Sequence, residues 1–192
     1  MVIVDGLLNS RQGEMLLKLA RQTLEQQFRK EKISLAPDEP ALSVKAAAFV
    51  TLKIDGKLRG CIGNLEPVGA LWEGIRDNAI NAAFNDHRFS PLTPDELSAV
   101  KLDISVLSQP KPLEYKGADD LLKKLRSGID GVILRDGHRG ATFLPQVWQQ
   151  LPSAEQFLGH LCLKAGLPQE SWRQKNLEIQ TYQVQCFEEE ER

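Results

Sequence analysis

One short stretch, residues 47–62, restricts the possible folds of this chain more than any other. Ala47 to Ile54 is rich in strand-forming residues, Asp55-Gly56 is a favoured two-residue hairpin turn, and Lys57 to Ile62 predicts the return strand. Strands joined by so short a turn must run antiparallel, because a parallel crossover needs a dozen or more residues. The chain therefore predicts a sheet that is largely antiparallel.

Helical patterns surround this hairpin. An amphipathic helix follows Ser10 and ends near Lys30, and another, with Val68 on its apolar stripe, ends near Asp86. We expect an α+β fold in which helices flank the sheet, within a single domain over residues 1–192. The other predicted elements are a loop at 36–40, a short helix after the capping box Thr93-Pro94-Asp95-Glu96, a strand over 100–106, a helix over 118–127, a hairpin of 131–135 and 141–144, a helix from Ser153 to Gly166, and a last strand over 177–187.

Composition argues against several classes of protein. The 192 residues are 42% hydrophobic and 26% charged, which is typical of a globular chain rather than a disordered one. A net charge of −2 gives no broad positive field, which disfavours nucleic acid as a partner, and no segment is apolar enough to span a membrane. The first eight residues lack a signal-peptide pattern, and three widely spaced cysteines predict free thiols. We expect a cytoplasmic protein.

Arg59 and Cys61 are the first candidates for chemistry. If the hairpin loop has two residues, strand alternation places both on one face together with Val50 and Leu52, whereas a three-residue loop changes these pairings. With either loop length, Arg59 and Cys61 lie on the same side of the strand, about 6–7 Å apart along it. A guanidinium at that range favours the thiolate, and apolar neighbours disfavour it. The residues leave both outcomes open.

Two glycines, Gly60 and Gly63, flank this cysteine. They permit a bulge, a sharp exit from the strand or the close approach of a ligand, which suits an exposed thiol beside a cleft. The alternative is a buried Cys61 that acts as a small hydrophobic residue, with the glycines present for packing. The sequence does not decide between a reactive and a structural cysteine.

A nucleophilic cysteine needs a base and a residue that orients the base. Of the three histidines, His138 is the best placed, because it lies in the glycine-rich loop of the second hairpin. His160 on a helix and His87 after a helix end both have ordinary structural explanations. A Cys61–His138 pair oriented by Asp86 is therefore the catalytic hypothesis.

Metal-binding spacings and nucleotide-binding loops are both missing from the sequence. We therefore expect no metal and no cofactor. A helix that begins shortly after Gly63 could still bind an anion, with help from Arg59.

Four segments of the chain are more specific together than any one of them alone. They are Leu58-Arg59-Gly60-Cys61-Ile62-Gly63, Asp86-His87-Arg88-Phe89-Ser90-Pro91-Leu92, Thr142-Phe143-Leu144-Pro145-Gln146-Val147, and Phe157-Leu158 through Leu161-Cys162-Leu163-Lys164-Ala165-Gly166-Leu167. In this order they resemble the AMMECR family, which also supplies protein A of the bacterial and archaeal AmmeMemoRadiSam system. The resemblance runs from the first helix to Gln185-Cys186-Phe187.

The resemblance implies an α+β fold with a larger and a smaller subdomain, and a cleft between them near Arg59-Gly60-Cys61. It also implies two partners: a Memo-like protein, similar to metal-dependent extradiol dioxygenases, and a radical S-adenosylmethionine protein. It implies no settled reaction.

Two functional hypotheses follow. In the first, slightly favoured, the chain is an enzyme or enzyme component that acts on a small or modified substrate through Cys61, while Arg59 binds an anionic group and Asp86 or His138 manages protons. In the second it is a non-catalytic binding or adaptor protein. Nucleic-acid or regulatory binding is a weaker third hypothesis. The remaining candidate binding residues are Gly60, Gly63 and Arg88.

Overall fold

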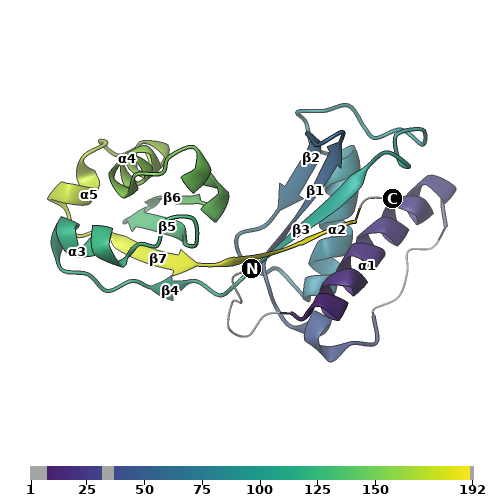
Figure 1. The fold of residues 1–192 in the computed structure, drawn as a ribbon, viewed down its shortest axis with the longest axis horizontal. Helices are drawn as coiled ribbons and strands as arrows, with labels where there is room; N and C mark the ends of the chain where they lie inside the picture. Colours follow the sequence, from purple (N-terminus) through teal and green to yellow (C-terminus); the bar gives the residue numbers. More distant parts are fainter. Residues whose placement is uncertain (1–7, 32–36, 191–192) are drawn as a thin grey trace. The chain divides into compact units, whose positions relative to one another are not determined.

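The computed structural model of the chain describes residues 8–31 and 37–190, which divide into two compact units (Figure 1). The N-terminal unit comprises residues 8–31, 37–107 and 185–190, and the central unit comprises residues 108–184. Of the eight residues about which the signal-peptide expectation was made, the first seven lie outside the described residues.

The N-terminal unit is built on a four-stranded sheet of order β2-β1-β3-β8. The pairs β1–β2 and β1–β3 are antiparallel, as the hairpin turn requires. Helices α1 and α2 cover one face of this sheet (Figure 1). The elements are α1 (Ser10–Arg29), the 3₁₀ helix η1 (Pro40–Ser43), β1 (Ala48–Ile54), β2 (Lys57–Gly63), α2 (Leu71–Phe84), β3 (Lys101–Leu107) and β8 (Val184–Glu188).

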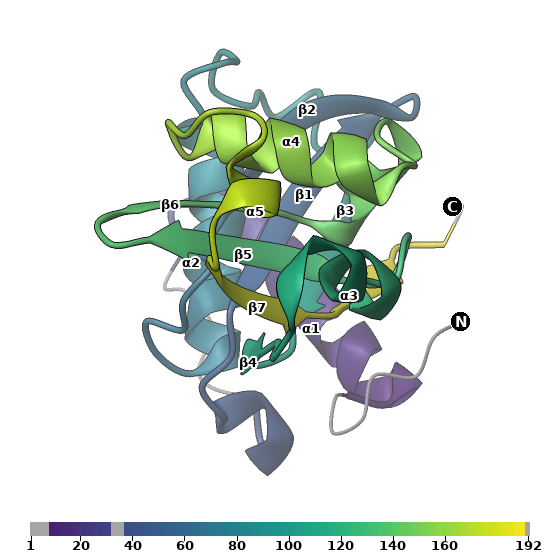
Figure 2. The same ribbon diagram turned by 90° about the vertical axis from the view of Figure 1, so that its left-hand side faces the viewer.

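The central unit contains the second four-stranded sheet, of order β4-β7-β5-β6. Helix α4 lies alongside the β5–β6 hairpin (Figure 2). Phe157 on α4 packs between two aromatic rings. Its ring stacks on Trp148, with 3.8 Å between the ring centres, and makes an edge contact with Phe143, with 5.2 Å between the ring centres. The elements are β4 (Lys111–Pro112), α3 (Gly117–Lys124), β5 (Gly131–Asp136), β6 (Arg139–Phe143), the 3₁₀ helix η2 (Pro145–Gln149), α4 (Ala154–Lys164), α5 (Ser171–Gln174) and β7 (Glu178–Tyr182).

The α+β fold class is confirmed, and so is the first hairpin. Ile54 pairs with Lys57 across a two-residue turn, and Asp55 (φ 50°) and Gly56 (φ 72°) both adopt the left-handed conformation that such turns need. The predicted register beyond the turn is wrong, however. The pairing shifts between Leu52 and Lys53, so that β2 contains a β-bulge.

The bulge changes which residues share a face. Leu58 pairs with Lys53 and Gly60 with Leu52, which leaves Arg59 as the additional residue. Cys61 consequently lies opposite Thr51, and not on the face of Val50. One inserted residue moves every later side chain to the other face, because side chains alternate along a strand.

Three other predictions need correction. Residues 94–99 form hydrogen-bonded turns instead of an α-helix. Val68 precedes α2 and is 81% exposed, so it does not belong to the apolar stripe of that helix. The single last strand is two strands, β7 and β8, which belong to different sheets. Of the predicted loop, Ala36 lies outside the described residues and Pro40 begins η1.

Candidate functional site

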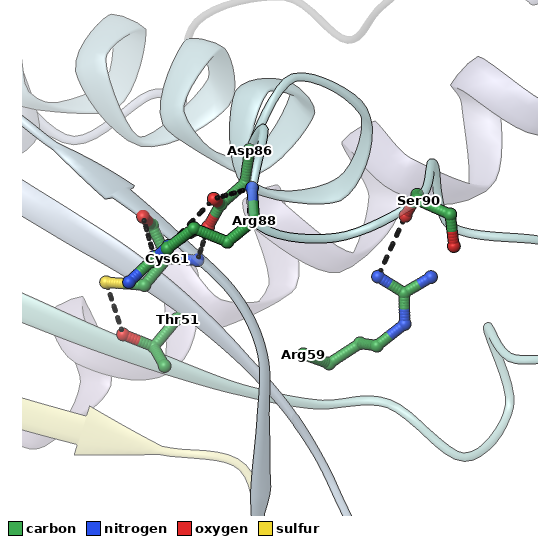
Figure 3. A network of polar contacts seen from close by, with 6 residues as sticks. All are labelled: Thr51, Arg59, Cys61, Asp86, Arg88 and Ser90. Atoms are coloured by element: carbon green, nitrogen blue, oxygen red, sulfur yellow. Dashed lines mark hydrogen bonds and ion pairs between the residues drawn. The ribbon is translucent and has the colours of Figure 1, made fainter.

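Cys61 lies on β2, the strand at one edge of its sheet. Both backbone polar groups of Cys61 have side-chain partners on the outer side of this edge (Figure 3). Its N–H donates to Asp86 Oδ2 at 2.9 Å, and its carbonyl oxygen accepts from Arg88 Nη2 at 3.1 Å. The two side chains thus provide the donor and the acceptor that a further strand would otherwise provide.

Asp86 is the centre of this arrangement. Its side chain is 2% exposed, and Arg88 donates to it from the backbone N–H (3.2 Å), Nε (2.9 Å) and Nη2 (2.7 Å). The Arg88 guanidinium, followed by the backbone N–H of Cys61, holds the pKa of Asp86 well below its usual range despite burial. Asp86 is therefore an ionised acceptor that positions backbone. A proton carrier needs a lone pair that a reacting group can reach. The catalytic role of Asp86 therefore stays a prediction.

Asp86 and Arg88 belong to the loop between α2 and β3. Arg59, the bulge residue, binds a different part of this loop. Its Nε and Nη2 donate to the two oxygens of Glu96 at 2.8 and 3.0 Å, and its Nη1 donates to the carbonyl of Ser90 at 3.0 Å. The guanidinium lowers the pKa of Glu96 to about 2. In Figure 3 the Arg59 guanidinium is directed toward Ser90 and away from the Cys61 sulfur. The Arg59 side chain is only 13% exposed, which leaves little of it for an anionic substrate.

The two glycines of the motif have packing roles in this structure. A Cβ on Gly60 would lie 2.1 Å from the carbonyl oxygen of Ala82 on α2, and one on Gly63 would lie 2.3 Å from the ring of Phe49. Only a residue without a side chain lets β2 approach α2 this closely. Ligand binding by Gly60 or Gly63 stays a prediction.

The Cys61 sulfur is the group that this network leaves available. Cys61 is partly exposed, and its Sγ accepts a hydrogen bond from the Thr51 hydroxyl at 3.3 Å (Figure 3). The arrangement can therefore present one fixed sulfur atom to a reaction partner.

The proposed base lies in the other unit. His138 is part of the turn between β5 and β6, and it is exposed, as the sequence predicts. Because Cys61 belongs to the N-terminal unit and His138 to the central unit, a Cys61–His138 pair stays a prediction.

Sequence reasoning missed Thr51 and the role of Glu96. Glu96 was recognised only as a capping residue, and its Oε2 does accept from the Thr93 N–H at 2.9 Å. Its ion pair with Arg59 spans 37 residues of sequence, and no local signal marks it. Thr51 could have been found from the hairpin pairing only if the bulge had been anticipated.

A cavity of about 440 Å³ opens at the end of β2, near the start of α2. Ile62 contributes to its lining and Cys61 does not. The cavity lies entirely within the N-terminal unit, and no predicted site residue contributes to it.

Within residues 8–31 and 37–190, no group of three or more His, Cys, Asp or Glu side chains could hold a metal ion. None of the described helices is long and apolar enough to cross a membrane. All three cysteines are free thiols, as the sequence predicts.

These features define an α+β protein with two antiparallel sheets, in which an Asp–Arg pair fixes a cysteine at a strand edge. The AMMECR1 family matches residues 17–187, and the chain belongs to this family. The family prediction made from the four sequence segments is thereby confirmed.

Similar proteins come from archaea. Protein MK0488 of Methanopyrus kandleri is 40% identical over 189 residues, which cover 94% of this chain and 89% of that protein. A protein of Methanothermobacter thermautotrophicus is 37% identical over 182 residues, 93% of this chain and 95% of its own length. The crystal structure of an uncharacterized protein, PH0010 from Pyrococcus horikoshii, matches with a TM-score of 0.82 at 32% identity and covers 95% of this chain and 94% of that one.

Proposed function

We propose that this chain is an enzyme or enzyme component that acts through the Cys61 thiol on a small or modified substrate. One observation carries the proposal: a partly exposed sulfur accepts the Thr51 hydroxyl, while Asp86 and Arg88 fix the backbone on either side of it. Fixing the backbone of a reactive residue reduces the cost of reaching a productive geometry.

The proposal changes the roles of the charged motif residues. Arg59, Asp86 and Arg88 are positioning residues, because their side chains bind backbone groups or each other. The thiol proton would leave to solvent or to a base such as His138. A cytoplasmic location, where thiols stay reduced, is part of the same proposal.

Partners enter the proposal from the resemblance to the AmmeMemoRadiSam system. A Memo-like protein and a radical S-adenosylmethionine protein would supply or consume the substrate that reacts at Cys61. A reactive thiol in one chain and metal-based chemistry in others suit successive steps on one compound.

The test is untargeted metabolite profiling of a deletion strain rescued with wild type, with Cys61→Ala or with the control Cys186→Ala. If Cys61 is the reactive group, wild type and Cys186→Ala restore the profile, whereas Cys61→Ala leaves a metabolite accumulated. Full rescue by folded Cys61→Ala would exclude thiol chemistry at this position.

A second candidate function is a non-catalytic binding or adaptor protein. It is favoured because the charges of Arg59 and Asp86 are paired within the protein, with Glu96 and Arg88 respectively. An adaptor should still co-purify with its partner after Cys61→Ser. Loss of the partner with this nearly isosteric change, in a protein that remains folded, would contradict the adaptor function.

A further inference from the structure

The cavity at the end of β2 has the size and the mixed lining of a small-molecule site. Its volume of about 440 Å³ lies within the usual range of roughly 300–1,000 Å³ for ligand pockets. Part of the lining is apolar and comes from Ala46, Ala47, Ala48 and Ile62. The polar part of the lining comes mainly from α2 and from the segment that precedes it.

The deepest polar group in the lining is the side chain of Asn78. The residue is 4% exposed, and its Nδ2 donates to the Ala48 carbonyl at 3.0 Å. Because a carbonyl can only accept, this bond fixes the orientation of the amide. Asn78 Oδ1 accepts no hydrogen bond from the described residues, and it is not one of the fully buried atoms that lack a partner. It is therefore open to the cavity, where water or a ligand can donate to it.

A carboxylate lies in the same lining. Glu73 Oε2 accepts the Ala70 N–H at 3.1 Å, and this single bond leaves the other oxygen of Glu73 as a further acceptor. Asn78 and Glu73 thus both offer acceptors. A ligand that matches them must bring hydrogen-bond donors, preferably with positive charge.

An anion is the main alternative, because the N-terminus of α2 contributes to the cavity. Two of the amide groups at this end of α2 already have partners. The N–H of Ala70 binds Glu73, and that of Leu71 binds the Val44 carbonyl at 2.9 Å. The carboxylate of Glu73 in the first turn already interacts with the helix dipole.

The one arginine in the lining does not reverse this preference. Arg76 Nε donates to Asp77 at 2.9 Å, and its guanidinium lies 5.3 Å from the centre of the Trp72 ring. The charge of Arg76 is paired with Asp77. Arg76 therefore does not neutralise the carboxylate of Glu73.

We propose that this cavity binds a small ligand that carries a protonated amino group on an apolar body. The ammonium group donates to Asn78 Oδ1 and to Glu73, and the apolar body packs on the alanines of β1 and the residues before it. The site is independent of the thiol, because Ile62 and Cys61 are neighbours in a strand and their side chains point to opposite faces.

The test uses three probes of similar shape: phenethylamine, the neutral 2-phenylethanol and the anionic phenylacetate. Binding is followed by two-dimensional NMR of the whole chain, through the backbone amides of Ala47 and Asn64 and the side-chain amide of Asn78. We expect saturable shifts with phenethylamine and at least tenfold weaker binding of the other two. Equal or tighter binding of phenylacetate, or no shifts with phenethylamine, would overturn the proposal.

Two variants locate the binding. A Cβ on Gly74 would contact nothing within 4 Å, so Gly74→Leu fills the cavity without disturbing the core. This variant should abolish phenethylamine binding. Glu73→Gln keeps the bond to Ala70 and should weaken binding about tenfold through the lost charge.

The control separates this site from the proposed thiol function. Cys61→Ser should leave phenethylamine binding unchanged, whatever its effect on metabolite profiles. Unchanged binding in folded Gly74→Leu would show that the amine binds elsewhere and would refute the assignment of this cavity.

Discussion

The two edges of the β2-β1-β3-β8 sheet each carry a cysteine beside a hydroxyl group, and the two pairs behave as a natural comparison. Cys61 on β2 accepts from Thr51 at 3.3 Å, and Cys186 on β8 lies 3.6 Å from the Ser105 hydroxyl. Thr51 and Ser105 belong to the central strands β1 and β3 and face the same side of the sheet. The local chemistry of the two thiols is therefore similar.

Their charged surroundings are not similar. Next to Cys61, the Arg88 guanidinium binds the backbone carbonyl and an ion pair neutralises the neighbouring Asp86. Next to Cys186, desolvation and then the carboxylates of Asp103 and Glu188 raise the pKa of the thiol, against the hydrogen bond from the hydroxyl. The comparison teaches that position relative to fixed charges distinguishes two cysteines with the same hydroxyl partner.

The largest expected effect comes from breaking the packing beneath Cys61. Gly60→Ala places a Cβ 2.1 Å from the Ala82 carbonyl oxygen, and relief requires β2 and α2 to separate. We expect the free energy of unfolding to fall by about 3 kcal/mol in urea titrations. The matched control is Gly74→Ala, in open space on α2, which should raise the free energy of unfolding by up to about 1 kcal/mol. Equal stability of the two variants would contradict the close contact.

Removing the carboxylate beside each cysteine tests the difference in charge directly. Asp86→Asn leaves the Arg88 guanidinium without its ionised partner and weakens the bond to the Cys61 N–H. The free energy of unfolding should therefore fall by about 2 kcal/mol. Asp103→Asn should cost less than about 1 kcal/mol, because burial already raises the pKa of Asp103 and its Lys53 partner is partly exposed. A larger loss from Asp103→Asn would reverse the comparison.

Alkylation rates report the thiols themselves. Cys186 is exposed, but its raised pKa reduces its thiolate fraction; with iodoacetamide at pH 7 we therefore expect Cys61 to react faster than Cys186, and the fully buried Cys162 to react last. Thr51→Val should slow Cys61 about threefold and leave Cys186 unchanged. Peptide mass spectrometry over a time course gives all three rates from one sample. An inert Cys61 in the native protein would end the case for thiol chemistry.

The smallest expected effect is an acid dependence of stability that arises from Glu96. Its pKa is lowered from 4.5 to about 2 in the fold, chiefly by Arg59. The stabilisation from this ion pair is therefore complete above pH 5 and is lost as the pH falls toward 2. We expect Glu96→Gln to be less stable than wild type by about 1 kcal/mol at pH 7 and about equal to it near pH 2.

Asp103 gives this pH experiment an opposite sign. Its pKa is raised by burial, so its ionised form opposes folding at neutral pH, and acidification removes that cost. The stability difference between wild type and Asp103→Asn should therefore move in favour of wild type as the pH falls. Parallel pH curves for Glu96→Gln and Asp103→Asn would contradict the contrast between the two edges.

Much of the local structure was predictable because its causes are local. The hairpin follows from strand-forming residues on both sides of Asp55-Gly56, and α1 follows from apolar spacing, although it begins at Ser10 itself, with Asn9 as its N-cap. The second hairpin, with His138 in its turn, was also predicted. Helix α3 ends at Lys124, three residues before the predicted end at Ser127.

The candidate site was predicted as a set of residues but not as an arrangement. The four segments identified the family, whereas the catalytic roles of Cys61 and Asp86 stay predictions. The Cys61 N–H reaches Asp86 across 25 residues of sequence, and Arg59 reaches Glu96 across 37. Such pairs depend on how separate elements pack, which no local propensity encodes.

The sequence by itself therefore determined the α+β class, most of the elements and the family of this protein. Tertiary structure decided the bulge at Arg59, the face on which Cys61 lies and the division of the last strand between two sheets. The physical reason is the same in each case. A period of two marks a strand without marking an inserted residue or a change of partner, and only packing against α2 and the loop after it selects the register.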